Sequence, residues 1–235
     1  MRYCRAVSRG RILGRTRWPG AVKSMRWSKL AFVLLALAAN SPASASALDD
    51  HDCFSGDNHR RIAGCSALIE QRDLDPRLQA SAYAMRALAY SLTGLYDTAI
   101  RDYDAAIRIV PDFAVALNNR AWAYFKSGRP SQGLPDVEHS LRLEPTSPHA
   151  YDTRAHIRQW TGDGSAALRD YEMAMRFGGE QMVKLYQCGL AAQKLYSGNV
   201  DGVYTIDLRR ALQVCIGTTE CDPLPPDEEC RAATS

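Results

Sequence analysis

A 34-residue repeat constrains the fold of this 235-residue chain more than any other feature. Three segments, residues 83–111, 117–145 and 151–179, align at this period without a gap. Three columns of small residues recur: Ala87, Ala121 and Ala155, then Gly94, Gly128 and Gly162, then Ala106, Ser140 and Ala174. Two helical patterns separated by a glycine, repeated at this period, predict a helix–turn–helix solenoid, so we expect an all-α fold.

The repeats resemble the tetratricopeptide repeat (TPR) family. That family packs small residues at the eighth, twentieth and twenty-seventh positions of each repeat around an aromatic residue at the twenty-fourth. The first repeat carries the signature through Ala87, Ala99, Tyr103, Ala106 and Pro111. The resemblance implies a TPR-type α-α superhelix with a small disulfide-stabilised helical module at its C-terminal end. The expected repeats are 80–113, 114–147 and 148–179, preceded by a degenerate repeat or cap at 48–79.

The first 47 residues have the composition of a secretory signal peptide. They hold nine Lys and Arg and no Asp or Glu, followed by the apolar run Leu30 to Ala39 and a stretch of small residues. This order predicts export, with cleavage after Ala45 or Ala47. The apolar run is shorter than the roughly 20 residues that a membrane-spanning helix needs. A more ordinary signal begins at Met25, where we expect the chain to start.

The net charge changes sign when the signal is removed. The whole chain has 29 Lys and Arg against 26 Asp and Glu, and without the nine in the signal 20 remain against 26, a net of −6. A mildly acidic protein is a poor partner for nucleic acid or anionic membrane. We therefore expect a periplasmic or otherwise exported protein of a Gram-negative cell envelope, which does not span the membrane after cleavage.

Six cysteines remain beyond the signal, and their even number in an exported chain predicts disulfides. Zinc binding is disfavoured because no paired C-x2-C spacing occurs. We expect a Cys53–Cys65 bridge that cross-links two helices of the N-terminal cap, whereas the tail cysteines allow three pairings that the sequence does not decide. The six are Cys53, Cys65, Cys188, Cys215, Cys221 and Cys230.

Two charged columns also follow the repeat. Because the helices of one repeat are antiparallel neighbours, the columns are able to meet as ion pairs. We prefer this structural interpretation to an arginine ladder for an acidic ligand, since every arginine comes with its own aspartate. The columns are Arg86, Arg120 and Arg154, and Asp102, Asp136 and Asp170.

The resemblance implies that the face lined by the first helices holds a protein or peptide partner. Asn119 matches an asparagine that many such arrays use to hold a ligand backbone. Trp122 and Trp160 either concentrate binding energy there or pack against the next helix, and both interpretations stay open. His149, Asp152 and His156 share one helical face, but we prefer polar groove residues to a metal site. The expected groove comprises Leu88, Asn118, Asn119, Trp122, Phe125, Lys126, Asp152, His156 and Trp160.

The tail, residues 180–235, is expected to form helices at Met182–Leu195 and Ile206–Ile216. The pattern YQxxLxxxxLYxGxVDGxY between them resembles a small helical peptidoglycan-binding domain, although the threonine that usually starts the next helix is not in place. The loop then either contacts the cell wall or caps the solenoid, with Val200 and Tyr204 buried and Asp201 bonded to its own loop. Its candidate residues are Tyr196, Gly198, Asp201, Gly202 and Tyr204.

The sequence holds no motif of a common enzyme class. It lacks G-x-S-x-G, H-E-x-x-H and a phosphate-binding loop, and the repeats bring no Cys–His pair together. We therefore expect a non-catalytic scaffold without a cofactor, in which the groove holds a partner and the tail docks to peptidoglycan. The alternative is an envelope scaffold with no affinity for the wall, in which the tail is a structural cap.

Overall fold

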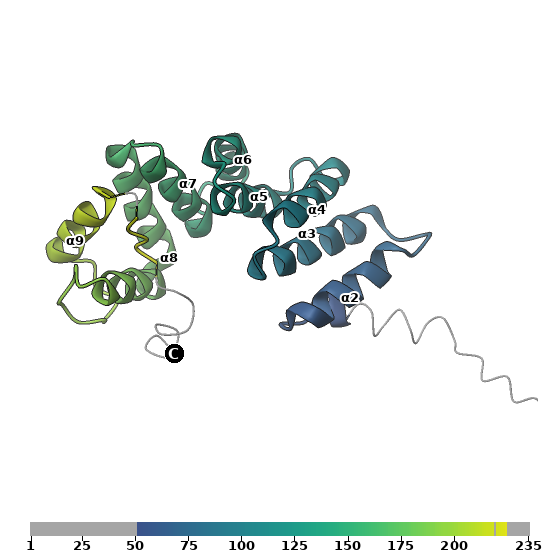
Figure 1. The fold of residues 1–235 in the computed structure, drawn as a ribbon, viewed down its shortest axis with the longest axis horizontal. Coiled ribbons are helices and arrows are strands. Elements are labelled where there is room, and N and C mark those ends of the chain that lie inside the picture. The colour runs from purple at the N-terminus through teal and green to yellow at the C-terminus, as the bar shows by residue number, and fades with distance from the viewer. Residues whose placement is uncertain (1–50, 219, 225–235) are drawn as a thin grey trace, which may run out of the picture. The chain divides into compact units, whose positions relative to one another are not determined.

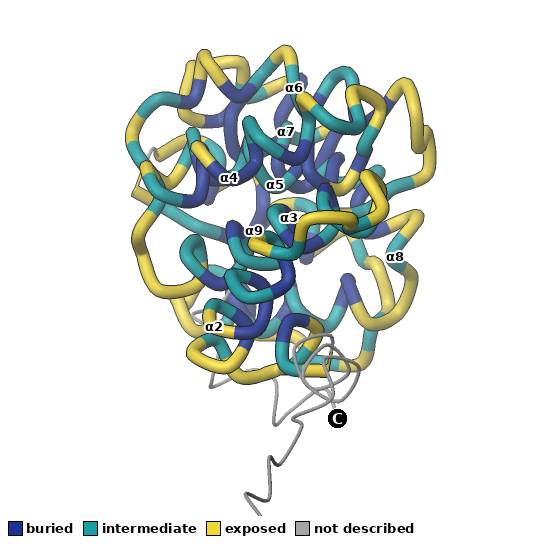
Figure 2. Tube along the Cα trace, turned by 90° about the vertical axis from the view of Figure 1, so that its right-hand side faces the viewer, coloured by how far each residue is buried: buried dark blue, intermediate teal, exposed yellow. Residues whose placement is uncertain are grey.

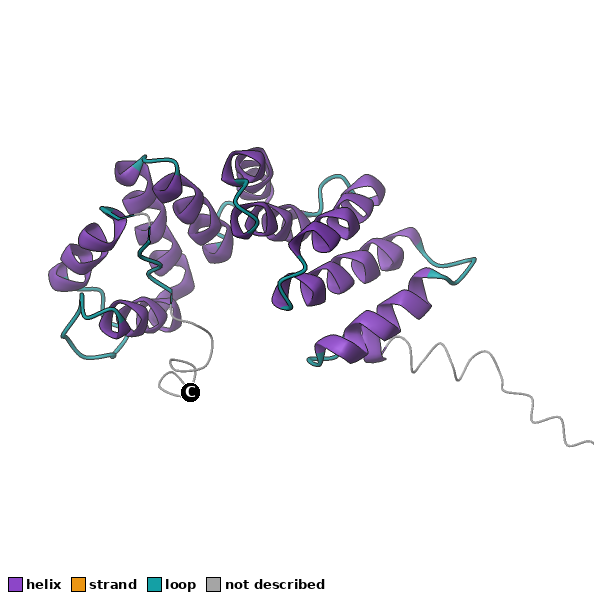
Figure 3. Cartoon of the chain, viewed as in Figure 1, coloured by secondary structure: helices purple, strands orange, loops and turns teal. Residues whose placement is uncertain are grey.

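The computed structural model describes residues 51–218 and 220–224, all of which lie in one structural unit, Asn40–Ser235. The predicted signal peptide and Cys230 lie outside these residues. Every regular element in the described ranges is a helix, as Figure 3 shows, which confirms the all-α class. The main helices are α2 (Asn58–Ile69), α3 (Pro76–Leu92), α4 (Tyr96–Ile109), α5 (Ala114–Lys126), α6 (Pro130–Leu143), α7 (Pro148–Trp160), α8 (Gly164–Ala192) and α9 (Ile206–Ile216).

Each predicted repeat is a pair of neighbouring helices: α3 with α4, α5 with α6, and α7 with the first half of α8 (Figure 1). The glycine column forms the turns, because Gly94, Gly128 and Gly162 have φ angles of 79°, 76° and 85°. Only glycine adopts this left-handed conformation without steric cost. The second helices end two residues before the prolines that follow them, at Ile109 and Leu143.

Local side-chain caps mark the starts of α2, α3, α7, α8 and α9, whereas α4, α5 and α6 begin without one. Asp75 precedes α3 and accepts hydrogen bonds from the amides of Arg77 at 2.9 Å and Leu78 at 3.1 Å. Thr205 precedes α9 and accepts one from the amide of Leu208 at 3.1 Å. Such caps pair amides that have no partner inside the helix. The expectation that no threonine starts the last helix was wrong, because Thr205 does so.

The small-residue columns form the contacts between the helices. Ala87, Ala121 and Ala155 are fully buried, and Tyr103 and Tyr171 fill the space beside two of them. A methyl group lets two helix backbones approach closely, and the ring then fills the gap that the next turn leaves. Figure 2 shows the consequence, with buried and exposed positions alternating along each helix. The residues that recur in the sequence are therefore the ones that pack between the helices.

The charged columns pair inside each repeat, as expected. Arg86 lies 2.7 Å from Asp102, Arg120 lies 2.7 Å from Asp136, and Arg154 lies 2.8 Å from Asp170. Each guanidinium uses two nitrogens on its aspartate, an arrangement that fixes orientation as well as distance. These side chains are mostly buried between the two helices. The structural interpretation of the ladder is confirmed.

The N-terminal cap carries the expected Cys53–Cys65 disulfide. Cys65 lies on α2, which packs against α3 through Leu68 and Ala82. The hydroxyl of Ser66 accepts a hydrogen bond of 2.9 Å from Arg86, so the ladder of polar contacts extends into the cap. A solenoid end has a neighbour on one side alone, and the disulfide ties this end down covalently.

The tail continues directly from the last repeat. Gly179, with φ 64° and ψ −154°, breaks α8 into two helices at the place where the period ends. The second half of α8 ends at Ala192, three residues before the predicted end, whereas α9 has the predicted bounds. Cys215 is bridged to Cys221, and Cys188 is also disulfide-bonded. None of the helices in the described ranges has the length and apolar character needed to cross a bilayer.

Candidate functional site

An aromatic cluster lies on the face formed by the first helices α5 and α7. The Trp122 ring lies 5.2 Å from Phe125 and 5.3 Å from His156 between centroids, and Phe125 lies 6.2 Å from Trp160. Trp122 is half-buried between the two helices, whereas Trp160 is 51% exposed. The two interpretations of the tryptophans therefore divide between them: Trp122 packs on the next helix, and Trp160 presents its ring to solvent.

Three cavities surround this cluster. The largest, about 600 Å³, extends from Leu92 and Trp122 to Gln193 and Leu224. A second of about 230 Å³ lies between Trp122 and the polar side chains at the start of α5 and α7. A third of about 170 Å³ separates Trp160 from the last described residues. We refer to these three cavities and the aromatic cluster together as the groove.

The structure brings together all but one of the predicted groove residues. Leu88 is half-buried on α3 and lines none of the three cavities, because these follow α5 and α7 toward the tail. The residues that do line them are Asn118, Asn119, Trp122, Phe125, Lys126, Asp152, His156 and Trp160.

His156 is the electrostatic centre of the groove. Its Nδ1 donates to the backbone carbonyl of Asp152 at 2.9 Å, and its Nε2 donates to the Asp222 carboxylate at 3.0 Å. Burial lowers the pKa of His156, but the Asp152 and Asp222 carboxylates outweigh it and raise this pKa to about 9. Burial raises the pKa of Asp152, which also accepts a hydrogen bond from the Tyr186 hydroxyl. The imidazole is therefore cationic at neutral pH.

The alternative of a metal site is not supported by this geometry. His149 is exposed, whereas both ring nitrogens of His156 are occupied by Asp152 and Asp222. Within residues 51–218 and 220–224, no three His, Cys, Asp or Glu side chains gather in a way that could hold an ion. His156 instead acts as a charged hydrogen-bond donor.

The last described segment enters the groove, which sequence analysis did not foresee. The Gln159 side-chain amide donates to the backbone carbonyls of Thr218 at 3.0 Å and Cys221 at 2.7 Å. Asp222 reaches His156, and the Asp222 carbonyl accepts from Gln193. A repeat period carries no information on contacts between distant segments. The sequence carries no local signal for these contacts, since it also leaves the pairing of Cys215 and Cys221 undecided.

The loop between α8 and α9 is held by its own residues. The fully buried Gln187 donates to the Asp201 carboxylate at 2.9 Å and accepts from the Gly202 amide at 2.8 Å. Asp201 also accepts from the Val203 amide at 2.9 Å, as the cap interpretation expected, and these bonds to Gln187 and Val203 lower its pKa. The residues of the peptidoglycan-binding-like motif are therefore bonded to one another within the loop.

The same loop borders a polar cleft of about 550 Å³. Tyr196, Gly198 and Asp201 line one side of the cleft, and Arg210 from α9 lines the other. Gly202 does not belong to its lining, since its backbone is turned toward Glu180. Three of the five predicted loop residues therefore share one surface.

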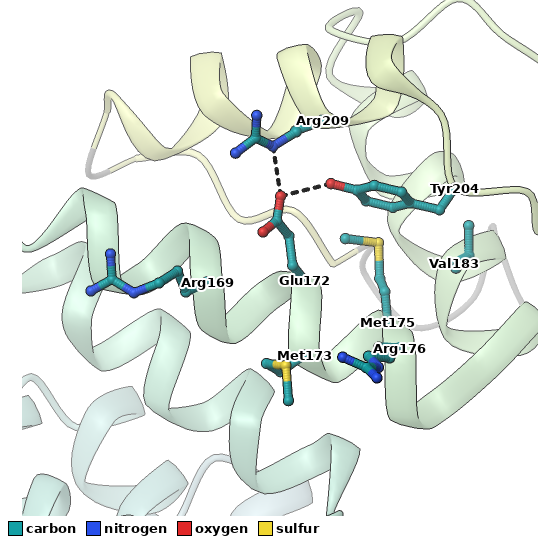
Figure 4. Close-up of a pocket in the computed structure, with 8 residues that line it drawn as sticks. All are labelled: Arg169, Glu172, Met173, Met175, Arg176, Val183, Tyr204 and Arg209. Atoms are coloured by element: carbon teal, nitrogen blue, oxygen red, sulfur yellow. Dashed lines mark hydrogen bonds and ion pairs between the residues drawn. The ribbon is translucent and has the colours of Figure 1, made fainter.

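Tyr204, the last of the five, lies elsewhere. It is 43% exposed, so the burial that the cap interpretation expected for it was wrong, and Val200 is partly buried. Figure 4 shows the reason: the Tyr204 hydroxyl turns to Glu172, to which it donates at 2.7 Å, and Arg209 donates to the same oxygen at 2.7 Å. The Arg209 bond joins α9 to α8, and Glu172, Tyr204 and Arg209 line a cavity of about 730 Å³ together with two methionines, Met173 and Met175.

Comparison with known proteins supports the repeat assignment. Residues 80–113 match the family model described as the tetratricopeptide repeat, and these residues span α3 and α4. No curated protein matches the chain. The match and the paired helices that continue beyond it show that the chain folds as a TPR-type helical solenoid.

Proposed function

We propose that this protein is a non-catalytic scaffold of the cell envelope whose groove binds a protein or peptide partner. The observation that carries the proposal is the exposed ring of Trp160 beside Phe125 and the cationic His156, at the edge of open cavities. Aromatic side chains with an adjacent cation are the residues in which binding energy concentrates at protein interfaces. TPR repeats support the same role, since they serve as protein-interaction scaffolds.

Two further observations support the location and the absence of catalysis. Disulfides persist in oxidising compartments, so the bridges Cys53–Cys65 and Cys215–Cys221 favour an exported, periplasmic protein. His156, the titratable group at the centre of the groove, has both ring nitrogens bonded to groups of its own chain. A general base needs a free nitrogen within reach of its substrate, so this arrangement favours binding over catalysis.

Photo-crosslinking in intact cells tests the groove. A photoreactive amino acid replaces Trp160 in one variant and Leu143 in the control, because Leu143 is also exposed but lies on α6. We expect an envelope protein to be captured from position 160 and not from 143. After identification by mass spectrometry, the purified partner should bind the wild-type protein at least tenfold more tightly than Trp160→Ala. Equal binding by the two proteins would refute the groove as the site.

The second candidate function is docking to peptidoglycan through the tail. The polar cleft lined by Tyr196, Gly198 and Asp201 favours it, because these residues belong to the resembling motif and share an open surface. The tail core includes Tyr171 of the last repeat, so truncation at Gly179 would expose that core. Point variants are therefore the better probe.

Co-sedimentation of the oxidised protein with purified peptidoglycan tests this second function. Arg210→Glu places a negative charge at the cleft, and the control Arg101→Glu makes the same change on an exposed position of α4. Wall docking predicts sedimentation of the wild type and the control, and its loss in Arg210→Glu. If none of the three proteins sediments with the wall, the tail is a cap on the solenoid and the alternative scaffold without wall affinity holds.

A further inference from the structure

The groove already holds a peptide, which is a segment of the same chain. Residues 220–224 follow the Cys215–Cys221 bridge and lie along α7 and the second half of α8. The side chains of Gln159 and Gln193 donate to their backbone carbonyls, at Cys221 and Asp222. Side-chain amides that bond backbone carbonyls hold the main chain of a segment whatever its side chains.

Three consecutive side chains of the segment add specificity. The Asp222 carboxylate accepts from the buried, cationic His156 at 3.0 Å, with Lys126 lining the same cavities. Pro223 is fully buried. Leu224 projects between the two larger members of the groove and lines both. The groove thus accepts a carboxylate and an aliphatic side chain, which are separated by a buried proline.

The site continues beyond the contact with Leu224. The cavity of about 230 Å³ next to it is lined by Asn118, which is 9% exposed and whose Oδ1 has no hydrogen-bond partner in the described residues. A buried acceptor without a partner is unfavourable, and an incoming N–H group would satisfy it. Neighbouring Asn119 and Asp152 provide further polar atoms, so this end of the groove is suited to peptide backbone.

We propose that residues Cys221–Leu224 are a built-in occupant of the groove, and that the partner displaces them with a segment of the same chemistry, Asp-Pro-Leu or its equivalent. The proposal rests on the proposed function of the groove and names its ligand class. The Cys215–Cys221 bridge keeps the occupant beside its site, so an external peptide competes with an effective concentration on the order of millimolar. The free protein would then be held in a state of low affinity.

Peptide binding to the full exported chain tests the proposal. The probe is acetyl-TTESDPL-amide, which has the sequence of residues 218–224 with serine in place of Cys221. Asp222→Ala/Leu224→Ala weakens the internal occupant and leaves the groove residues of α5 and α7 intact. Trp122 and Trp160 are the two tryptophans beyond the predicted signal, so their fluorescence reports binding directly.

We expect the double variant to bind the probe at least tenfold more tightly than the wild type. Replacing the probe's aspartate by asparagine, or reversing its last three residues, should abolish that gain, as should His156→Gln in the double-variant background. Equal affinities for wild type and variant, or equal binding of the reversed probe, would overturn the proposal. Circular dichroism confirms folding, and if the double variant is unfolded, Leu224→Ala alone is judged by the same criteria.

The peptide-binding experiment and the crosslinking experiment can refute their two proposals independently. A partner that depends on Trp160, together with a variant that binds no probe, would leave the groove as the binding surface and refute the built-in occupant. If the double variant binds the probe through the probe's aspartate and His156, but no partner is captured at position 160, the built-in occupant is supported and the scaffold role is refuted.

Discussion

His156 and Asp222 are sixty-six positions apart in the chain, and the imidazole Nε2 lies 3.0 Å from the Asp222 carboxylate. This bond joins the third repeat to the segment that follows the last helix. Asp152 faces the ring from its own helix, and Tyr186 approaches Asp152 from α8. A buried cation between two carboxylates offsets their charge, so the three groups stabilise one another. Removing one of them leaves a buried charge without a partner.

The first prediction concerns pH. The pKa of His156 in the folded protein, about 9, lies above its ordinary value of 6.5. The stabilisation is therefore complete below pH 6.5 and is lost as the pH rises through 9. For a shift of this size the loss is about 3 kcal/mol as an upper bound. Two-dimensional NMR of the imidazole should show His156 titrating near pH 9, and denaturation midpoints should fall over this range.

The acid side of the same pair has the opposite sign. Burial raises the pKa of Asp222, but the hydrogen bond from His156 outweighs it and lowers this pKa below 3.8. Its contribution is present above pH 3.8 and is lost as the pH falls through the folded value.

In His156→Gln the loss of stability between pH 6.5 and 9 should disappear. A wild-type denaturation midpoint that stays flat over that range would contradict the pairing.

The second prediction concerns the ion-pair columns. Asp170 holds both Arg154 and Arg158, with contacts of 2.8 and 2.7 Å, and its side chain is 4% exposed. Asp170→Asn leaves two partly buried guanidinium groups without a counter-charge, so we expect a loss of about 3 kcal/mol in the free energy of unfolding. Urea denaturation of the oxidised protein measures it.

Asp104→Asn is the matched control for Asp170→Asn. Asp104 also pairs with an arginine of the column, Arg120, at 2.7 Å, but its side chain is 41% exposed and Asp136 remains as a second partner. Its loss should cost between about 0 and 1 kcal/mol. Similar losses for Asp104→Asn and Asp170→Asn would show that burial does not determine the strength of these pairs.

The third prediction concerns the loop between α8 and α9. Gly202 has φ 78°, and a Cβ there would lie 3.0 Å from the Glu180 carbonyl oxygen and 2.2 Å from the Glu180 Cγ. Gly94 has φ 79° and open space around it, so Gly94→Ala should cost about 1 kcal/mol from backbone conformation alone. Gly202→Ala adds the contact with Glu180, and we expect a loss of about 2–3 kcal/mol by urea denaturation. Equal losses would mean that Glu180 moves freely.

The sequence predicted what the repeat period governs. Ala87 and its column fix the packing, Gly94 and its column fix the turns, and Arg86 meets Asp102 because both recur with the helices. The groove followed from the same period, since Trp122 and His156 are one repeat apart. The sequence could not predict the position of Asp222, because the tail lies outside the repeat period. The approach of Asp222 to His156 depends on the path of the chain after Cys215.

Tyr204 illustrates a second limit of sequence analysis. A tyrosine in an apolar motif reads as a buried residue, but its hydroxyl needs a hydrogen-bond partner, and the partner is Glu172 at the surface of α8. Whether Tyr204 buries its ring or exposes it to bond its hydroxyl depends on Glu172, thirty-two positions away. Local patterns carry no information at that distance, whereas Thr205 acts as a helix cap on the next four residues and was open to prediction from them.

The last prediction concerns the N-terminal cap. The Cys53–Cys65 bridge closes a loop with a sequence separation of 12, and such a bridge stabilises by about 2–4 kcal/mol. A solenoid distributes its stability over neighbouring units, so Cys53→Ala/Cys65→Ala should loosen α2 and leave α5 to α9 unchanged. Hydrogen exchange should therefore rise in α2 and on the face of α3 that contacts it, through Leu68 and Ala82. An equal rise in α9 would contradict this, because it would mean that the chain unfolds as a single cooperative unit.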